Sequence, residues 1–220
     1  MSRFGTIDRR VFADPEIPDG RGAVSGGTVV ALTTTEGVLL AADGRTGRET
    51  SIRSESVRKI ASIHPRAAIG SPDDLGAVRS FVRSLRADVD RYEYRRGASM
   101  GIPALATLAS EELRGESSPA ATFVLGGVDE DGPHVFTIDP DAGAIEDAYA
   151  AAGSGRAIAY GILDSRVTDS VRMAEARLIA TAVLERVAER DIRTGTRAFV
   201  AEITEAGVDI QEYDAPDTLD

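Results

Sequence analysis

The order of apolar and polar positions in the first half of the chain predicts a group of four strands. Two runs rich in β-branched and aliphatic residues, 28–34 and 38–43, flank a Thr-Glu-Gly turn, which is typical of a β-hairpin. The polar stretch 44–56 predicts a loop. Two further apolar runs, 57–63 and 67–71, are separated by His-Pro-Arg, and each predicts a strand.

Two helices are predicted after these strands. Residues 73–96 carry apolar side chains at steps of three or four positions, the spacing of an amphipathic helix. The predicted apolar stripe consists of Leu75, Val78, Val82, Leu85, Val89 and Tyr92. Acidic residues at the start of this segment, arginines at its end and Gly97 just beyond fit the helix dipole and a glycine stop. Residues 102–113, with Pro103 near the start, predict the second helix.

The second half of the chain repeats the order of strands followed by helices. Apolar runs at 121–128, 133–139 and 144–152, joined by acidic turns that contain glycine, predict a three-stranded meander. A short helix is predicted within 153–165, and a long helix is predicted for 169–191. The apolar side of the long helix is predicted to contain Val171, Ala174, Leu178, Ala182, Val183 and Val187.

A closing hairpin is predicted at 197–210, so strands and helices form separate groups along the chain. Helices on the outer faces of two mainly antiparallel sheets give a four-layer α-β-β-α sandwich of the α+β class. No internal repeat or linker follows residue 26, and we therefore expect one domain over residues 27–212. Residues 1–26 are rich in Pro, Gly, Asp and Arg without a helical or strand period, which predicts a flexible leader or propeptide. Residues 213–220 are predicted to form an acidic tail.

Composition and charge argue against several classes of function. The formal net charge of −11 disfavours nucleic acid, whose phosphates require clustered basic side chains. No run of 18 apolar residues is present, so we expect no membrane span. The chain has no cysteine, and its only histidines, His64 and His134, lie far apart in the sequence. We therefore expect no metal ion and no other cofactor, and we expect a cytoplasm of high salt concentration from the acidic, lysine-poor composition.

The single lysine of the chain is a candidate functional residue. Of the 25 basic residues, 24 are arginines, and Lys59 is the exception. A compact ammonium group tolerates burial and shifts its pKa, whereas a guanidinium group does not. The Gly-Ser-Gly segment 153–155 is better explained by a turn than by a nucleotide loop, because it lacks the glycine spacing of a dinucleotide-binding motif.

Four residues in this strand order resemble the active-site set of the β-type subunits of the proteasome core particle. They are Asp43 at a strand end, Lys59, Ser154 in Gly-Ser-Gly and Asp191 in Glu-Arg-Asp-Ile-Arg-Thr-Gly. The resemblance covers roughly residues 26–210 and is most specific over the stretch VLGGVDEDGPHVFTIDPDAGAIEDAYAAAGSGRAIAYGILD, which begins at Val124. It implies the fold of the N-terminal-nucleophile hydrolases.

The resemblance also implies a threonine protease chemistry. In this family a propeptide is removed just before a threonine, whose hydroxyl attacks the substrate carbonyl while its freed α-amine acts as the base. An α-amine has a pKa near 8 and is suited to this role at neutral pH. By resemblance, Lys59 and Asp43 tune that amine, Ser154 and Asp191 support it, and a backbone N–H near Gly70 forms the oxyanion hole.

The position of the nucleophile departs from the family pattern. When the spacing of the family is counted back from Asp43 and from Lys59, both counts lead to Gly27, one residue before Thr28. Successive side chains of a strand point to opposite faces, so a shift of one residue turns the Thr28 hydroxyl away from Lys59. Silent β-type subunits exist in this family, some of them with glycine at this place. The spacing favours a silent subunit.

An active enzyme is the alternative. The bond between Gly27 and Thr28 is of the kind that self-cleavage uses, the other four candidate residues are retained, and the turn before residue 38 could absorb a deletion of one residue. Thr28 is therefore a candidate nucleophile, exposed by self-cleavage after Gly27.

The resemblance implies partners and a cellular role. We expect β-type neighbours and a stacked α-type ring, unfolded proteins as substrates, and an indirect link to a regulatory ATPase, all in the cytoplasm. The ATP-dependent protease ring of bacteria shares this fold, and ADGRTG at 42–47 resembles its acid segment, but the long meander fits the proteasome better. An α-type subunit would carry a helix before the first strand, for which residues 1–26 show no period. If the chain were a scaffold unrelated to proteolysis, the spacing of Lys59 and Asp43 would match the family pattern only by chance.

Overall fold

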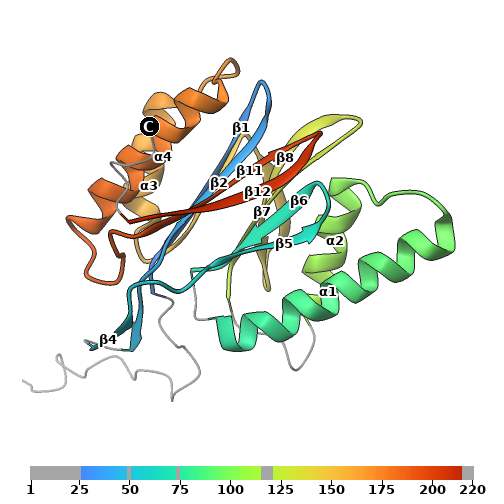
Figure 1. The fold of residues 1–220 in the computed structure, drawn as a ribbon, viewed down its shortest axis with the longest axis horizontal. Coiled ribbons are helices and arrows are strands. Elements are labelled where there is room, and N and C mark those ends of the chain that lie inside the picture. Colours follow the sequence, from blue (N-terminus) through green and yellow to red (C-terminus); the bar gives the residue numbers. More distant parts are fainter. Residues whose placement is uncertain (1–25, 49–50, 73–74, 115–120, 215–220) are drawn as a thin grey trace, which may run out of the picture.

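The computed structural model describes residues 26–48, 51–72, 75–114 and 121–214. Residues 1–25 of the predicted leader, most of the predicted acidic tail and the acidic residues that start the first predicted helix lie outside these ranges. Two five-stranded antiparallel sheets form the centre of the molecule (Figure 1).

The first sheet has the strand order β10-β1-β2-β11-β12. Its strands are β1 (Thr28–Thr34), β2 (Gly37–Asp43), β10 (Tyr149–Gly153), β11 (Ala198–Thr204) and β12 (Gly207–Tyr213). The second sheet has the order β5-β6-β7-β8-β9. Its strands are β5 (Ile60–His64), β6 (Ala67–Gly70), β7 (Phe123–Asp129), β8 (Gly132–Asp139) and β9 (Gly143–Asp147).

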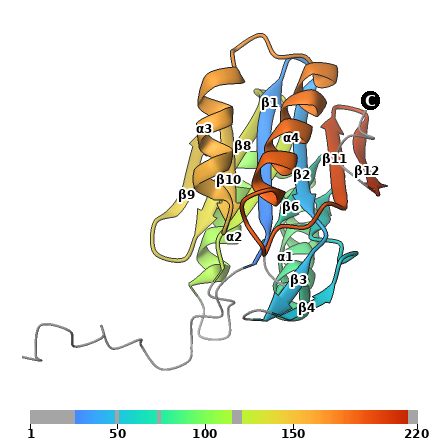
Figure 2. The same cartoon turned by 90° about the vertical axis from the view of Figure 1, so that its left-hand side faces the viewer.

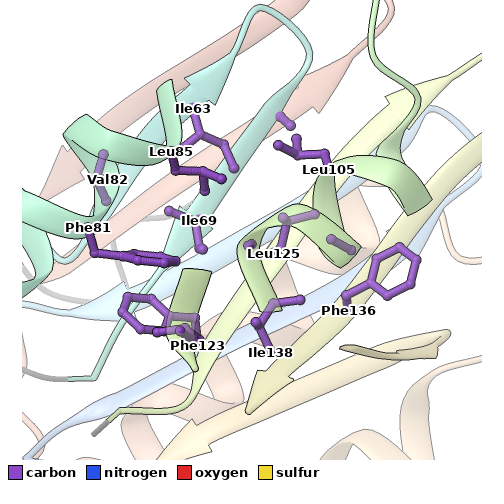
Figure 3. Packing of buried hydrophobic residues seen from close by; sticks show 14 of the residues in the cluster. Ile63, Ile69, Phe81, Val82, Leu85, Leu105, Phe123, Leu125, Phe136 and Ile138 are labelled. Atoms are coloured by element: carbon purple, nitrogen blue, oxygen red, sulfur yellow. The ribbon is translucent and has the colours of Figure 1, made fainter. Parts of the chain in front are cut away.

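Two helices cover the outer face of each sheet, as Figure 1 and the quarter turn in Figure 2 show. The helices are α1 (Leu75–Arg96), α2 (Ile102–Leu113), α3 (Arg156–Arg166) and α4 (Met173–Ala188). Three separate apolar cores follow: one between α1, α2 and the second sheet (Figure 3), one between α3, α4 and the first sheet, and one between the two sheets. The predicted four-layer sandwich is confirmed.

Strands β1 and β2 are buried on both faces because they lie in the middle layers. In β1, Val30 and Leu32 pack towards α3 and α4, whereas Val29 and Ala31 pack between the sheets. This alternation fixes which side chain of the N-terminal strand faces which layer.

Two strand predictions were wrong. The predicted loop 44–56 contains a short hairpin of β3 (Thr46–Arg48) and β4 (Ser51–Ser54). The predicted single strand 144–152 is divided at Ala148 into β9 and β10, which pair with β8 and β1 in different sheets. A single residue separates the two strands, so no loop in the sequence marks the point at which the chain crosses from one sheet to the other.

The helix predictions succeeded for α1 and failed in part for α4. In α1, Val78, Val82, Leu85 and Val89 are buried as predicted, and Tyr92 is half-buried. In α4 the long predicted helix begins later and ends earlier, and Ala174 and Leu178 are exposed. The buried side of α4 consists of Met173, Ala176, Ile179, Ala180, Val183, Leu184 and Val187. The buried side of this helix could not be identified from the sequence, because several sets of positions in this alanine-rich segment have the spacing of an apolar stripe.

His134 joins three elements of the second sheet to the start of α2. Its Nε2 lies 3.0 Å from Asp129 and its Nδ1 lies 2.6 Å from Glu146. The other oxygen of Asp129 accepts the backbone N–H of Ile102 at 2.7 Å. Burial alone would lower the pKa of His134, but the hydrogen bonds and charges of the two carboxylates raise it above the ordinary value.

The same substitution at two leucines tests the packing. We expect Leu85→Ala, at a side chain with no exposure, to lower the free energy of unfolding by about 2–5 kcal/mol because it opens a cavity. The control Leu178→Ala, at a side chain 56% exposed, should change it by less than about 0.5 kcal/mol. Urea unfolding measures both values, and equal losses would contradict the buried side assigned to each helix.

The raised pKa of His134 predicts a pH dependence of stability. The folded pKa lies above the unfolded one, so the stabilisation is complete below about pH 6.5 and is lost as the pH rises through the folded pKa. The stability difference between the wild type and His134→Gln should therefore shrink between about pH 6 and pH 9 in urea unfolding. A difference that stays constant over this range would contradict the His134 contacts.

Candidate active site

The carboxylate of Asp43, the last residue of β2, receives four hydrogen bonds and is fully buried. One oxygen accepts Lys59 Nζ at 2.8 Å and the Thr28 backbone N–H at 2.7 Å. The other accepts the backbone N–H groups of Arg45 and Gly195, each at 2.8 Å. Asp43 therefore connects the start of β1, the end of β2, the segment before β11 and the segment before β5.

Lys59 precedes β5 in the second sheet and reaches Asp43 in the first. Its side chain has no exposure, and Nζ lies 3.4 Å from the backbone oxygen of Gly26. A buried ammonium group is costly unless a carboxylate compensates it, and Asp43 does so. The single lysine of the chain thus occupies a buried position where it is paired with a carboxylate.

Gly27 lies directly against this ion pair. A Cβ atom added to Gly27 would stand 2.0 Å from Lys59 Nζ and 2.4 Å from the Asp43 carboxylate. Residue 27 is therefore the position whose side chain would point at the lysine. Its φ of +93° lies in the left-handed region, which favours glycine.

Thr28 points the other way, towards α3 and α4. Its side chain is fully buried, and Oγ1 lies 2.8 Å from the Thr194 hydroxyl. A Cβ atom added to Gly155 would stand 2.3 Å from Thr28 Oγ1, so the glycine leaves room for this hydroxyl. Its orientation follows from the alternation of β1, in which Val30 also faces the helices.

Ser154 and Asp191 lie on the Thr28 side of the backbone. Asp191 accepts hydrogen bonds from Ser154 Oγ at 2.5 Å and from Thr194 Oγ1 at 2.7 Å. The Gly27 carbonyl oxygen accepts the Ser154 backbone N–H at 3.0 Å and lies 3.2 Å from the Ser154 hydroxyl oxygen. Burial would raise the pKa of Asp191, but these hydroxyl donors and the backbone N–H of Arg193 lower it below its ordinary value.

The structure thus places the other four candidate residues around Gly27 and Thr28, which are consecutive in the backbone. Asp43 and Lys59 lie at Gly27, and Ser154 and Asp191 lie on the side of Thr28. The backbone donors of Arg45 and Gly195 could not be found from the sequence, because every residue except proline supplies an N–H group.

Gly70 has a packing explanation of its own. It lies in β6 opposite Ile60 and Val124, and a Cβ atom there would stand 2.7 Å from a methyl group of Val29. Its role in an oxyanion hole stays a prediction.

The described ranges contain no group of three or more His, Cys, Asp or Glu side chains that could hold a metal ion. Within the same ranges, no helix is both long enough and apolar enough to cross a membrane.

Comparison with known proteins identifies the family of the chain. A family model described as "Proteasome subunit" matches residues 23–203. "Proteasome subunit beta" of Halomicrobium mukohataei is 43% identical over 209 residues, covering 92% of this chain and 87% of that protein. "Proteasome subunit beta" of Haloferax volcanii is 38% identical over 213 residues, covering 97% and 86%. "Proteasome subunit beta 1" of Haloarcula marismortui is 40% identical over 198 residues, covering 89% and 82%. The chain therefore belongs to the proteasome subunit family, and its relatives there are β-type subunits.

Proposed function

We propose that this chain is a β-type ring subunit of a proteasome core particle that does not cleave peptide bonds itself. It takes part in ATP-dependent degradation of unfolded proteins in the cytoplasm, beside other β-type subunits, a stacked α-type ring and an external ATPase. The observation that carries the proposal is the glycine at position 27, where a side chain would meet Lys59.

The space at Gly27 supports this proposal. A nucleophile activated by the lysine would need a hydroxyl between residue 27 and Lys59, and glycine has none. The Lys59 ammonium and the Asp43 carboxylate already stand where the first atom of such a side chain would lie. The left-handed φ of Gly27 adds a cost to any side chain there. The pair Lys59–Asp43 then serves the fold as a buried ion pair.

The alternative, an active site at Thr28, has one observation in its favour. The Gly27 carbonyl accepts the backbone N–H of Ser154 and lies near its hydroxyl, and the Thr28 hydroxyl is linked through Thr194 to Asp191. The bond between residues 27 and 28 therefore lies among groups that could assist its cleavage. Against it, the Thr28 hydroxyl is fully buried and bound to Thr194. A substrate carbonyl would have to displace the segments of Gly155 and Thr194 to reach it.

Labelling with an electrophile that reacts only with a free N-terminal threonine tests the proposal. We expect the assembled protein and its Thr28→Ala variant each to keep the mass of its own unmodified chain, because no threonine amine is free beside Lys59. An active threonine protease treated in parallel verifies the reagent. A covalent adduct on the wild type that disappears in Thr28→Ala would overturn the silent function in favour of the alternative.

The structural role of the ion pair predicts unequal losses of stability. Asp43→Asn leaves the Lys59 ammonium buried without a carboxylate and should lower the free energy of unfolding by about 3–5 kcal/mol. Lys59→Met should cost less, since the carboxylate keeps three backbone N–H donors. Chemical denaturation measures both. A smaller loss for Asp43→Asn than for Lys59→Met would contradict the central position given to Asp43.

A further inference from the structure

The sequence contains a single side-chain amine, which belongs to Lys59, because the other 24 of its 25 basic residues are arginines. Lysine is the usual target of acetylation and of conjugation to a protein tag, whereas the guanidinium group of arginine stays charged. Cysteine, the other strong nucleophile among the side chains, is absent from the sequence. Reactions directed at amines therefore have two targets in this chain, the Nζ atom of Lys59 and the α-amine.

The fold closes the approach to Lys59. Its side chain has no exposure, and Nζ lies 2.8 Å from a carboxylate oxygen of Asp43 and 3.4 Å from the backbone oxygen of Gly26. A Cβ atom added to Gly27 would stand only 2.0 Å from Nζ, so not even one carbon atom fits on that side. An incoming acyl group is larger than one carbon atom, and the folded chain leaves it no room there.

The ion pair also removes the nucleophile. Within the pair Lys59 is an ammonium group, whose nitrogen has no lone pair with which to attack an acyl carbon. Removal of its proton would leave the fully buried carboxylate of Asp43 without a cation. A buried charge that has lost its partner is costly, and the folded site therefore resists the step that would activate the amine.

Several segments must move before Nζ can meet solvent. The backbone oxygen of Lys59 accepts the Ser71 N–H at 3.0 Å, and Ile60, the next residue, is buried between the two sheets. On the other side of the ion pair, Asp43 accepts the backbone N–H groups of Arg45 and Gly195. The amine thus becomes accessible only in openings that separate β2 from the segment before β5.

We propose that Lys59 is a conditional modification site, which takes an activated acyl group only when the chain is unfolded or opened at the contact with Asp43. In the opened chain the ammonium group gives its proton to water. Nζ then attacks the acyl carbon, an amide bond forms, and the bond from that carbon to its leaving group breaks. A folded copy offers such reactions its α-amine alone, so an acyl group on Lys59 marks copies that have lost their fold.

The inference rests on the silent function proposed above. A cut after Gly27 would remove Gly26 and Gly27, the two residues that lie against Nζ in addition to Asp43. A subunit that releases Thr28 would therefore open the approach to Lys59, whereas a subunit with an intact bond keeps it closed.

Acetylation with the N-hydroxysuccinimide ester of acetic acid tests the proposal on the purified, assembled protein. Hydroxylamine then removes acetyl groups from oxygen and imidazole, and intact mass with peptide mapping locates those on amines. In native buffer we expect acetylation of the α-amine alone, and in guanidinium chloride we expect acetylation of Lys59 as well. Arg190→Lys is the matched control, because it places a lysine at an exposed position beyond α4 that should react in the folded protein.

The rate of acetylation decides the outcome. In native buffer Lys59 should react at least about 100-fold more slowly than the lysine introduced by Arg190→Lys, because it must wait for the structure to open. A smaller difference would overturn the proposal. Across a guanidinium chloride series the rate at Lys59 should rise over the same range in which the chain unfolds. A rate at Lys59 that does not depend on the denaturant would also overturn it.

The N-terminal peptide of the same digest distinguishes the failure of this inference from the failure of the silent function. Rapid acetylation of Lys59 in folded chains that retain Gly27 overturns the conditional site and leaves the silent function in place. Rapid acetylation in folded chains that begin at Thr28 overturns both.

Discussion

The buried carboxylate of Asp43 is the interaction on which the rest of the site depends. It receives one ammonium donor and three backbone N–H donors that come from four separate segments of the chain. Two of these donors come from different sheets, because Thr28 begins β1 of the first sheet and Lys59 directly precedes β5 of the second. The carboxylate therefore fixes the first strand and the lysine at the same time, and it determines which backbone residue lies against the lysine.

The silent function that we propose rests on this placement and on the period of a strand. With Thr28 N–H bound to Asp43, the residue before it faces Lys59, and the side chain of Thr28 faces the helices. A shift of one residue along the strand would exchange these environments. The chain thus keeps a charged pair and a hydroxyl network that are separated by the backbone rather than joined in one reaction centre.

Much of this arrangement could be predicted from the sequence. The helix period located α1, and the lone lysine among arginines indicated that Lys59 had a special place. The division at Ala148 could not be predicted, because both strands on either side of it carry apolar residues and only tertiary pairing separates them. The left-handed φ of Gly27 could not be predicted either, because a glycine before a strand is compatible with many conformations. The spacing from Asp43 and Lys59 nevertheless pointed to that residue.

The proposed silent function requires an intact bond between Gly27 and Thr28, and the intact mass and N-terminal sequence of the purified, assembled protein test that bond most directly. If the subunit is silent, the bond remains intact, and every mature chain retains Gly27, whether or not residues before it have been trimmed. A uniform population of chains that begin at Thr28 would contradict the account, because it would mean that the protein releases a threonine amine beside Asp43.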